Sequence, residues 1–177
     1  MELRTLRYFL AIAREENMTR AAESLHVTQP ALSKQMKSLE HELGKKLFIR
    51  HSFNIQLTEE GILLRKRAED LIRMADKISQ EFLSLDDITG GELYLGLAES
   101  YQIRYLAREI RKFKESYPSL HYHITSGDTE QVTEKLDKGL LDFAVLAEEP
   151  DPAKYNCICF PESDTWGLVM PSDHPLA

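Results

Sequence analysis

Hydrophobic positions in the first 45 residues recur with a helical period in three successive stretches. The first stretch, residues 3–16, has apolar residues every three or four positions, which predicts an amphipathic helix. The residues expected to face inward are Leu3, Leu6, Phe9, Leu10 and Ala13. A shorter second helix should contact its neighbours through the small side chains Ala21 and Ala22 together with Leu25. A third helix has an apolar stripe formed by Leu32, Met36, Leu39 and Leu43.

The third helix is the most informative segment of the chain. Thr28 is a favourable N-cap, Pro30 falls in the first turn, where a missing N–H costs nothing, and Gly44 ends the helix. The face opposite the apolar stripe is polar and cationic: Gln29, Pro30, Ser33, Lys34, Lys37 and His41. An α-helix fits the major groove of B-DNA, where amide, hydroxyl and ammonium groups can reach base edges and phosphates. The two short helices therefore predict a DNA-binding helix-turn-helix.

After Gly44 the apolar period changes from helical to alternating. Ile55 and Leu57 alternate with Asn54 and Gln56 after a polar turn, which predicts a short two-stranded wing. We therefore expect residues 1–58 to form a winged helix-turn-helix DNA-binding domain.

Residues 59–89 predict one long helix. Thr58 is the candidate N-cap, and Glu59 and Glu60 place negative charge in the first turn. Apolar residues then alternate in steps of four and three, the spacing of a coiled coil: Leu64, Ala68, Leu71, Ala75, Ile78, Phe82 and Leu85. This stripe predicts a dimerisation seam that would hold two DNA-binding domains on a two-fold-symmetric operator, and the alternative is a helix packed on its own domain.

The remaining segment, residues 90–177, alternates between strand and helix patterns. Strands are predicted at 92–98, 120–127 and 141–147, helices at 103–118 and 129–139, and two further strands at 155–162 and 165–171. This alternation is typical of parallel βαβ units. The expected fold class is thus α+β and multidomain: a winged helix-turn-helix, a long dimerisation helix and an α/β lobe.

The charge distribution supports a nucleic-acid partner at one end only. The net charge is −7, yet residues 1–58 contain nine Lys and Arg against six Asp and Glu. No apolar run is long enough to cross a bilayer, and two cysteines are too few for a disulfide framework, so we expect a cytoplasmic protein. We expect Cys157 and Cys159 to be buried, inert thiols.

Enzymatic activity is not expected. The turn after the first strand of the lobe, AESYQ, is not a glycine-rich phosphate loop, and no nucleophile–base–acid set is recognisable. His121 and His123 alternate on one strand without a third metal ligand at a suitable spacing, so neither a metal nor a cofactor is predicted.

Five sequence words resemble the LysR-type transcriptional regulators: LRYFLAIA, TRAAESLHVTQPALSKQMKSLEHELGKKLFIR, LTEEG, GLLDFAVL and LVMPSDHPLA. The resemblance implies a dimer or tetramer on operator DNA and a periplasmic-binding-protein-like α/β domain that takes a small-molecule effector. It also implies residue roles. Those expected at base edges are Gln29, Pro30, Ser33 and Lys34, and those expected at phosphates are Thr19, Arg20, Thr28, Lys37 and Arg50. Those expected to face an effector are Ser100, Asp128 and Thr129.

Three departures from that family pattern change the expectations. Lys34 stands where many relatives have an arginine, and lysine lacks the planar fork that reads guanine. Phe53 occupies the wing tip, where relatives often have an arginine that enters the minor groove, and a phenylalanine cannot donate a hydrogen bond there. The sequence stops at Ala177, where relatives continue into a second lobe, so weak or absent effector binding is expected. The alternative function is a truncated DNA-binding dimer that does not sense an effector.

Overall fold

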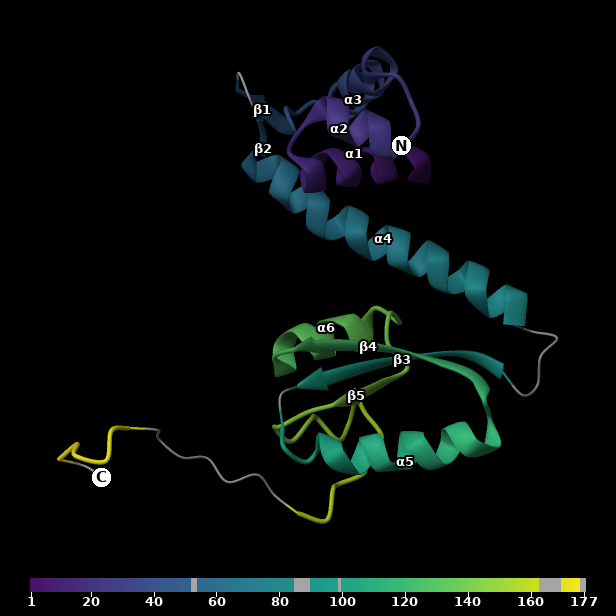
Figure 1. Cartoon of the computed structure of the whole chain (residues 1–177), viewed down its shortest axis with the longest axis vertical. Coiled ribbons are helices and arrows are strands. Elements are labelled where there is room, and N and C mark those ends of the chain that lie inside the picture. Colours follow the sequence, from purple (N-terminus) through teal and green to yellow (C-terminus); the bar gives the residue numbers. More distant parts are fainter. Residues whose placement is uncertain (52–53, 85–89, 99, 163–169, 176–177) are drawn as a thin grey trace. The chain divides into compact units, whose positions relative to one another are not determined.

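The computed structural model describes residues 1–51, 54–84, 90–98, 100–162 and 170–175. The chain forms two compact units, Met1–Ser79 and Gln80–Ala177, with the helical unit at the N-terminal end (Figure 1).

Three helices form the core of the first unit: α1 (Leu3–Glu15), α2 (Met18–Ser24) and α3 (Gln29–Leu43). Their largest fully buried side chains are Leu6, Phe9, Ile12, Leu32, Met36 and Leu39. The predicted helices are therefore confirmed, with two exceptions on their inward faces. Leu3 and Leu43 are exposed because they lie in the terminal turns of α1 and α3, beyond the contact region of the bundle.

The predicted wing is also present and is attached to the helices. Strands β1 (Phe48–Arg50) and β2 (Ile55–Leu57) pair antiparallel, with Phe48 opposite Leu57. The Phe48 ring packs on Phe9 of α1, with 5.3 Å between ring centroids. The N–H of Ile55 donates to the carbonyl of Glu16, 2.8 Å away, just after α1 ends. The base of the wing thus belongs to the same core as the helices.

The long helix α4 (Glu59–Ser84) begins where the sequence indicates. The N–H of Gly61 donates to the Thr58 hydroxyl over 2.9 Å, which confirms Thr58 as the cap. Ala68 has no accessible surface, and Ala68 and Ile72 lie in the core of the first unit, with Leu64 packed against it.

This packing corrects part of the predicted dimerisation seam. Ala68 contributes to the core of its own chain because the 64–68–72 row of α4, at steps of four, turns toward that core. Leu71, Ile78 and Phe82 are exposed, and Ala75 is half-buried. Leu85 lies outside the described residues. The part of the stripe that remains available to a partner therefore begins at Leu71.

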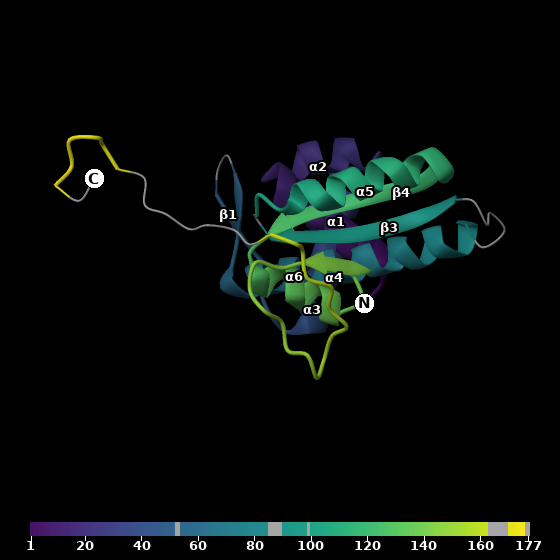
Figure 2. The ribbon, with the colours of Figure 1, turned by 90° about the horizontal axis from the view of Figure 1, so that it is seen from below.

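The second unit is built on a parallel sheet. Strands β3 (Gly90–Ala98), β4 (Ser119–Gly127) and β5 (Phe143–Val145) lie in the order β4-β3-β5. Helices α5 (Ile103–Ser116) and α6 (Thr129–Asp137) lie on opposite faces of the sheet (Figures 1 and 2). A Cβ added to Gly96 would lie 2.4 Å from Leu141 Cδ1 and 2.6 Å from Val132 Cγ1. Glycine there lets α6 approach the sheet closely.

The prediction for residues 155–162 is wrong. The structure assigns no strand to these residues, because they form no ladder with β3, β4 or β5. Cys157 and Cys159 are exposed as a result, so the expectation of buried thiols is also wrong. Most of the other predicted strand, residues 165–169 of 165–171, lies outside the described residues.

Candidate nucleic-acid interface

The turn between α2 and α3 is shaped by caps on both helices. The Asn17 side chain begins α2 by accepting from the N–H groups of Thr19 and Arg20, at 2.9 and 3.1 Å. After α2, His26 adopts a left-handed conformation with φ of 54°, and the N–H of Val27 donates to the Ala22 carbonyl over 3.0 Å. The chain can therefore reverse within a few residues, as a helix-turn-helix requires.

The boundaries of α3 agree with the sequence prediction. The Thr28 hydroxyl accepts from the N–H of Ala31 at 3.4 Å, and Pro30 occupies the first turn. Gly44 ends the helix with φ of 66°, and the N–H of Lys45 donates back to the Glu40 carbonyl over 3.1 Å. Local hydrogen bonds thus define both ends of α3.

One face of α3 is buried and the opposite face is available to solvent. The predicted contact residues Thr19, Arg20, Thr28, Gln29, Pro30, Lys34 and Lys37 are all exposed, and Ser33 is half-buried. Among the described residues, Lys34 and Lys37 form no ion pair with a carboxylate, so both ammonium groups are available to an anionic partner. Arg50 ends β1, but its side chain is outside the described part of the chain.

Arg20 differs from the two lysines in being held in place. Its guanidinium donates to the carbonyl of Glu15 at the end of α1, over 3.3 Å. The cation therefore remains close to the start of α2 and keeps donors to spare for a phosphate.

Sequence reasoning missed the role of Glu40. Its side chain lies in the buried row of α3, at 9% exposure, and its two oxygens accept from the N–H of Leu47 and from the Lys46 ammonium, both at 2.9 Å. Burial raises the pKa of the Glu40 carboxyl, but the hydrogen bonds from Leu47 and Lys46, the positive charge of Lys46 and a backbone hydrogen bond from Phe48 together outweigh it and leave that pKa below its ordinary value. The available signal was its position four residues after Met36, on the face where an apolar residue is expected.

Thr58 holds the base of the wing from the other side. Its hydroxyl donates to the Lys46 carbonyl over 2.7 Å, and its N–H donates to the Leu47 carbonyl over 3.1 Å. We call Lys46 and Leu47 the wing base. The backbone of the wing base is therefore bonded to Thr58, the N-cap of α4, and to Glu40 of α3.

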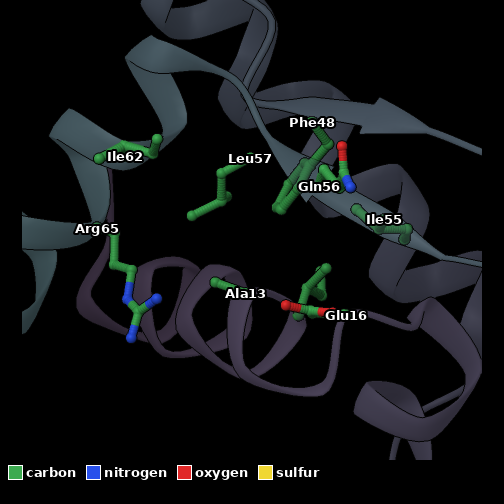
Figure 3. A pocket seen from close by; sticks show the side chains of 9 residues that line it. Ala13, Glu16, Phe48, Ile55, Gln56, Leu57, Ile62 and Arg65 are labelled. Carbon is green, nitrogen blue, oxygen red and sulfur yellow. The ribbon is translucent and has the colours of Figure 1, made fainter.

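An open hollow of about 180 Å³ lies between α1, the wing and the start of α4 (Figure 3). It is lined by Ile12, Ala13, Glu16, Phe48, Ile55, Gln56, Leu57, Ile62 and Arg65. None of these residues belongs to α2 or α3, so the hollow is separate from the exposed face of α3.

The predicted effector residues lie at one edge of the sheet in the second unit. Ser100 follows β3 and Asp128 follows β4, and the last residues of these neighbouring parallel strands, Ala98 and Gly127, are paired. The Ser100 hydroxyl accepts from the N–H of Gln102 at 3.1 Å, and Asp128 accepts from the N–H of Gln131 at 2.7 Å. Asp128 is thus the N-cap of α6.

Thr129 is the first residue of α6 and is not the N-cap of this helix. The Asp128 carboxylate takes that role because an aspartate at the preceding position reaches the free N–H groups of the first turn.

The comparisons with known proteins agree with this arrangement. The family described as "Bacterial regulatory helix-turn-helix protein, lysR family" matches residues 3–62, and the LysR substrate binding domain matches residues 87–177. The chain belongs to the LysR family.

Curated relatives extend beyond this chain. A probable RuBisCO transcriptional regulator of Thalassiosira pseudonana is 34% identical over 99% of this chain and 58% of its own length. A hydrogen peroxide-inducible genes activator of Pectobacterium carotovorum subsp. carotovorum is 33% identical over 100% of this chain and 58% of its own length. The chain thus spans less than two thirds of the length of these relatives.

The fold of this LysR-family chain is similar to the folds of solved structures of other regulators. Full-length CbnR complexed with its target DNA matches with a TM-score of 0.68 and 30% identity, over 80% of this chain and 48% of CbnR. The H2O2-bound C206S mutant of Corynebacterium glutamicum OxyR matches with a TM-score of 0.54 and 27% identity, over 81% of this chain and 46% of OxyR.

Within the described ranges, no helix is both long enough and apolar enough to cross a bilayer.

Proposed function

We propose that this LysR-family chain is a sequence-specific DNA-binding transcriptional regulator that reads its operator with α3. The observation that carries the proposal is the division of α3 into two faces. Leu32, Met36 and Leu39 fix the helix in the core. On the opposite face, Lys34 and Lys37 are exposed and have no carboxylate partner in the part of the chain that the structure describes. CbnR, which resembles this chain in fold and sequence, has been solved with its target DNA.

The proposed contacts divide into two classes by their positions in the sequence motif that resembles the LysR-type regulators. Gln29, Pro30, Ser33 and Lys34 lie in the first two turns of α3 and would approach base edges in the major groove. Thr19, Arg20, Thr28, Lys37 and Arg50 would contact phosphates and fix the orientation of the protein on the duplex.

The proposed assembly is a dimer, or a tetramer built from dimers, on the operator. Leu71, Ile78 and Phe82 expose apolar surface along α4, which supports a seam between two copies. A small-molecule effector would bind at the carboxyl edge of the parallel sheet, beside Ser100, Asp128 and Thr129. This role is one of binding without catalysis or cofactor, and it would be exercised in the cytoplasm.

A binding experiment on the full chain tests the proposal. A preferred duplex is first selected from a random-sequence library, and its affinity is compared with that of a scrambled duplex of the same composition. Ser33→Ala or Lys34→Ala should lower the preference by about 1–3 kcal/mol for each base contact that the substitution removes. Lys37→Ala should weaken binding to both duplexes equally and reduce the slope of log K against log salt by about one.

Lys114→Ala, at an exposed lysine near the end of α5, is the matched control and should change neither quantity. Failure of the library to yield a preferred duplex would overturn the proposed function. Equal behaviour of the three α3 variants on both duplexes would overturn the assignment of base and phosphate contacts.

A further inference from the structure

We infer that Glu40 is a positioning residue for DNA binding: its carboxylate fixes the direction of the wing relative to α3. The inference rests on the proposed function, since it concerns how the two DNA-facing elements are held in register. It starts from the unusual location of Glu40, a carboxylate in the buried row of the helix that is proposed to read bases.

The contact between Glu40 and the wing base is short and is shielded from water. One carboxylate oxygen accepts from the N–H of Leu47, which is itself 1% exposed. The second oxygen accepts from the Lys46 ammonium, whose side chain is largely exposed. A hydrogen bond from a buried N–H to a charged acceptor is among the stronger ones in proteins. The bond to Leu47 is therefore the important one for position, and the Lys46 ion pair is secondary.

Glu40 supplies the one side-chain hydrogen bond that the described structure shows between α3 and the backbone of the wing base. The other attachments of the wing come from elsewhere. Thr58, before α4, bonds to the wing base, and Ile55 bonds to the end of α1. Removal of the Glu40 carboxylate would leave the β1–β2 pairing and these attachments intact. The wing should consequently stay folded while its direction relative to α3 becomes less fixed.

This change matters at the end of β1. Leu47 directly precedes β1, and the strand ends three residues later at Arg50, a proposed phosphate contact. A small rotation at the wing base is carried along the strand, so phosphate contacts made by the wing would break before those made by α3. The slope of log K against log salt rises with the number of neutralised phosphates, so it measures this effect directly.

The test uses Glu40→Ala, Glu40→Gln and Glu42→Ala in the full chain, with the library-selected duplex as probe. Glu40→Ala should speed exchange of the Leu47 amide by about tenfold or more and reduce the salt slope by about one for each phosphate that the wing no longer reaches. Glu40→Gln keeps an acceptor for the Leu47 N–H and should retain most of the amide protection and of the slope. Glu42→Ala, at an exposed position of the same helix, makes the same charge change and should alter neither quantity.

The outcomes separate this inference from the proposed function. A wild-type salt slope in Glu40→Ala, together with an unprotected Leu47 amide, would overturn the positioning role and leave DNA binding untouched. A reduced slope in Glu42→Ala equal to that in Glu40→Ala would overturn it as well, since charge alone would then explain the effect. If Glu40→Ala does not fold, Glu40→Gln provides the test. A reduced salt slope in Glu40→Gln while the Leu47 amide stays protected would overturn the positioning role, because DNA binding would then change although the bond to Leu47 is kept. Absence of salt-dependent DNA binding by the wild-type chain would instead overturn the proposed function.

Discussion

Gly61 in the first turn of α4 gives a prediction whose sign depends on tertiary structure. On helix propensity alone, replacing an exposed helical glycine by alanine stabilises a protein by about 0.8–1 kcal/mol. At this position, however, an added Cβ would lie 2.2 Å from the Leu47 carbonyl oxygen and 3.1 Å from Leu57 Cδ2. The first of these atoms is backbone, so no side-chain rotation can relieve the overlap.

The cost follows from what must move. Either the first turn of α4 or the wing base has to shift, and the two are joined by the bond from the Thr58 N–H to the Leu47 carbonyl. Overpacking costs about 1–3 kcal/mol, and loss of one hydrogen bond costs about 1 kcal/mol. After subtraction of the propensity gain, Gly61→Ala should lower the free energy of unfolding by about 1–3 kcal/mol.

Amide exchange of core residues in α1 and α3, measured in the full chain under increasing urea, reports the unfolding free energy of the first unit. Gly44→Ala serves as the comparison. Gly44 has φ of 66° and no atom within 4 Å of an added Cβ, so this variant should lose about 1–2 kcal/mol from backbone strain alone. Wild-type or greater stability in Gly61→Ala would refute the reasoning, because it would mean that the wing base yields without cost.

Three further predictions concern other parts of the chain. Asn17→Ala removes the cap of α2 and should cost about 1 kcal/mol in urea unfolding, whereas Asn17→Asp should cost little; equal losses in both would contradict the cap. The lowered pKa of Glu40 contributes stability that is present above pH 4.5 and is lost as the pH falls through the folded-state pKa. The difference in unfolding free energy between wild type and Glu40→Gln should therefore shrink below pH 4.5. A difference that stays constant with pH would contradict this contribution. Ile78→Asp should convert the proposed dimer to monomer with unchanged helix content, and an unchanged mass by light scattering would exclude the seam.

The features that sequence predicted well are local ones. Helices α1 to α4 and strands β3 to β5 follow apolar periods that span only a few residues, and most of their caps are read from one side chain and its position. Thr28 and Gly44 bound α3 as expected, because a cap bonds to N–H groups within its own first turn and a left-handed glycine closes the last one. The location of the exposed α3 face follows from the same periodicity.

Other features depend on contacts between distant residues. The 3–4 spacing in α4 fits both a seam between chains and a row packed on the chain's own core, and only the position of that core assigns Ala68 to the second use. Cys157 and Cys159 alternate like strand residues, yet a strand also needs a partner with open hydrogen-bonding positions. At the start of α6, Asp128 and Thr129 are both good capping residues, and the backbone decides between them.

The wing base shows why predicting α3 from the sequence does not by itself predict the geometry of the proposed interface. In the sequence, Glu40 is one of several acidic residues on the polar helix α3, and Gly61 is a residue of low helix propensity in the long helix α4. Each is explained only by Leu47, whose N–H bonds to Glu40 and whose carbonyl excludes a side chain at Gly61. These contacts join the wing base to α3 and to the start of α4, and the proposed DNA binding by α3 and the wing would depend on the position that they set. The chemistry of the proposed interface is therefore present in residues 17–50, while its geometry also requires α4 to begin where it does.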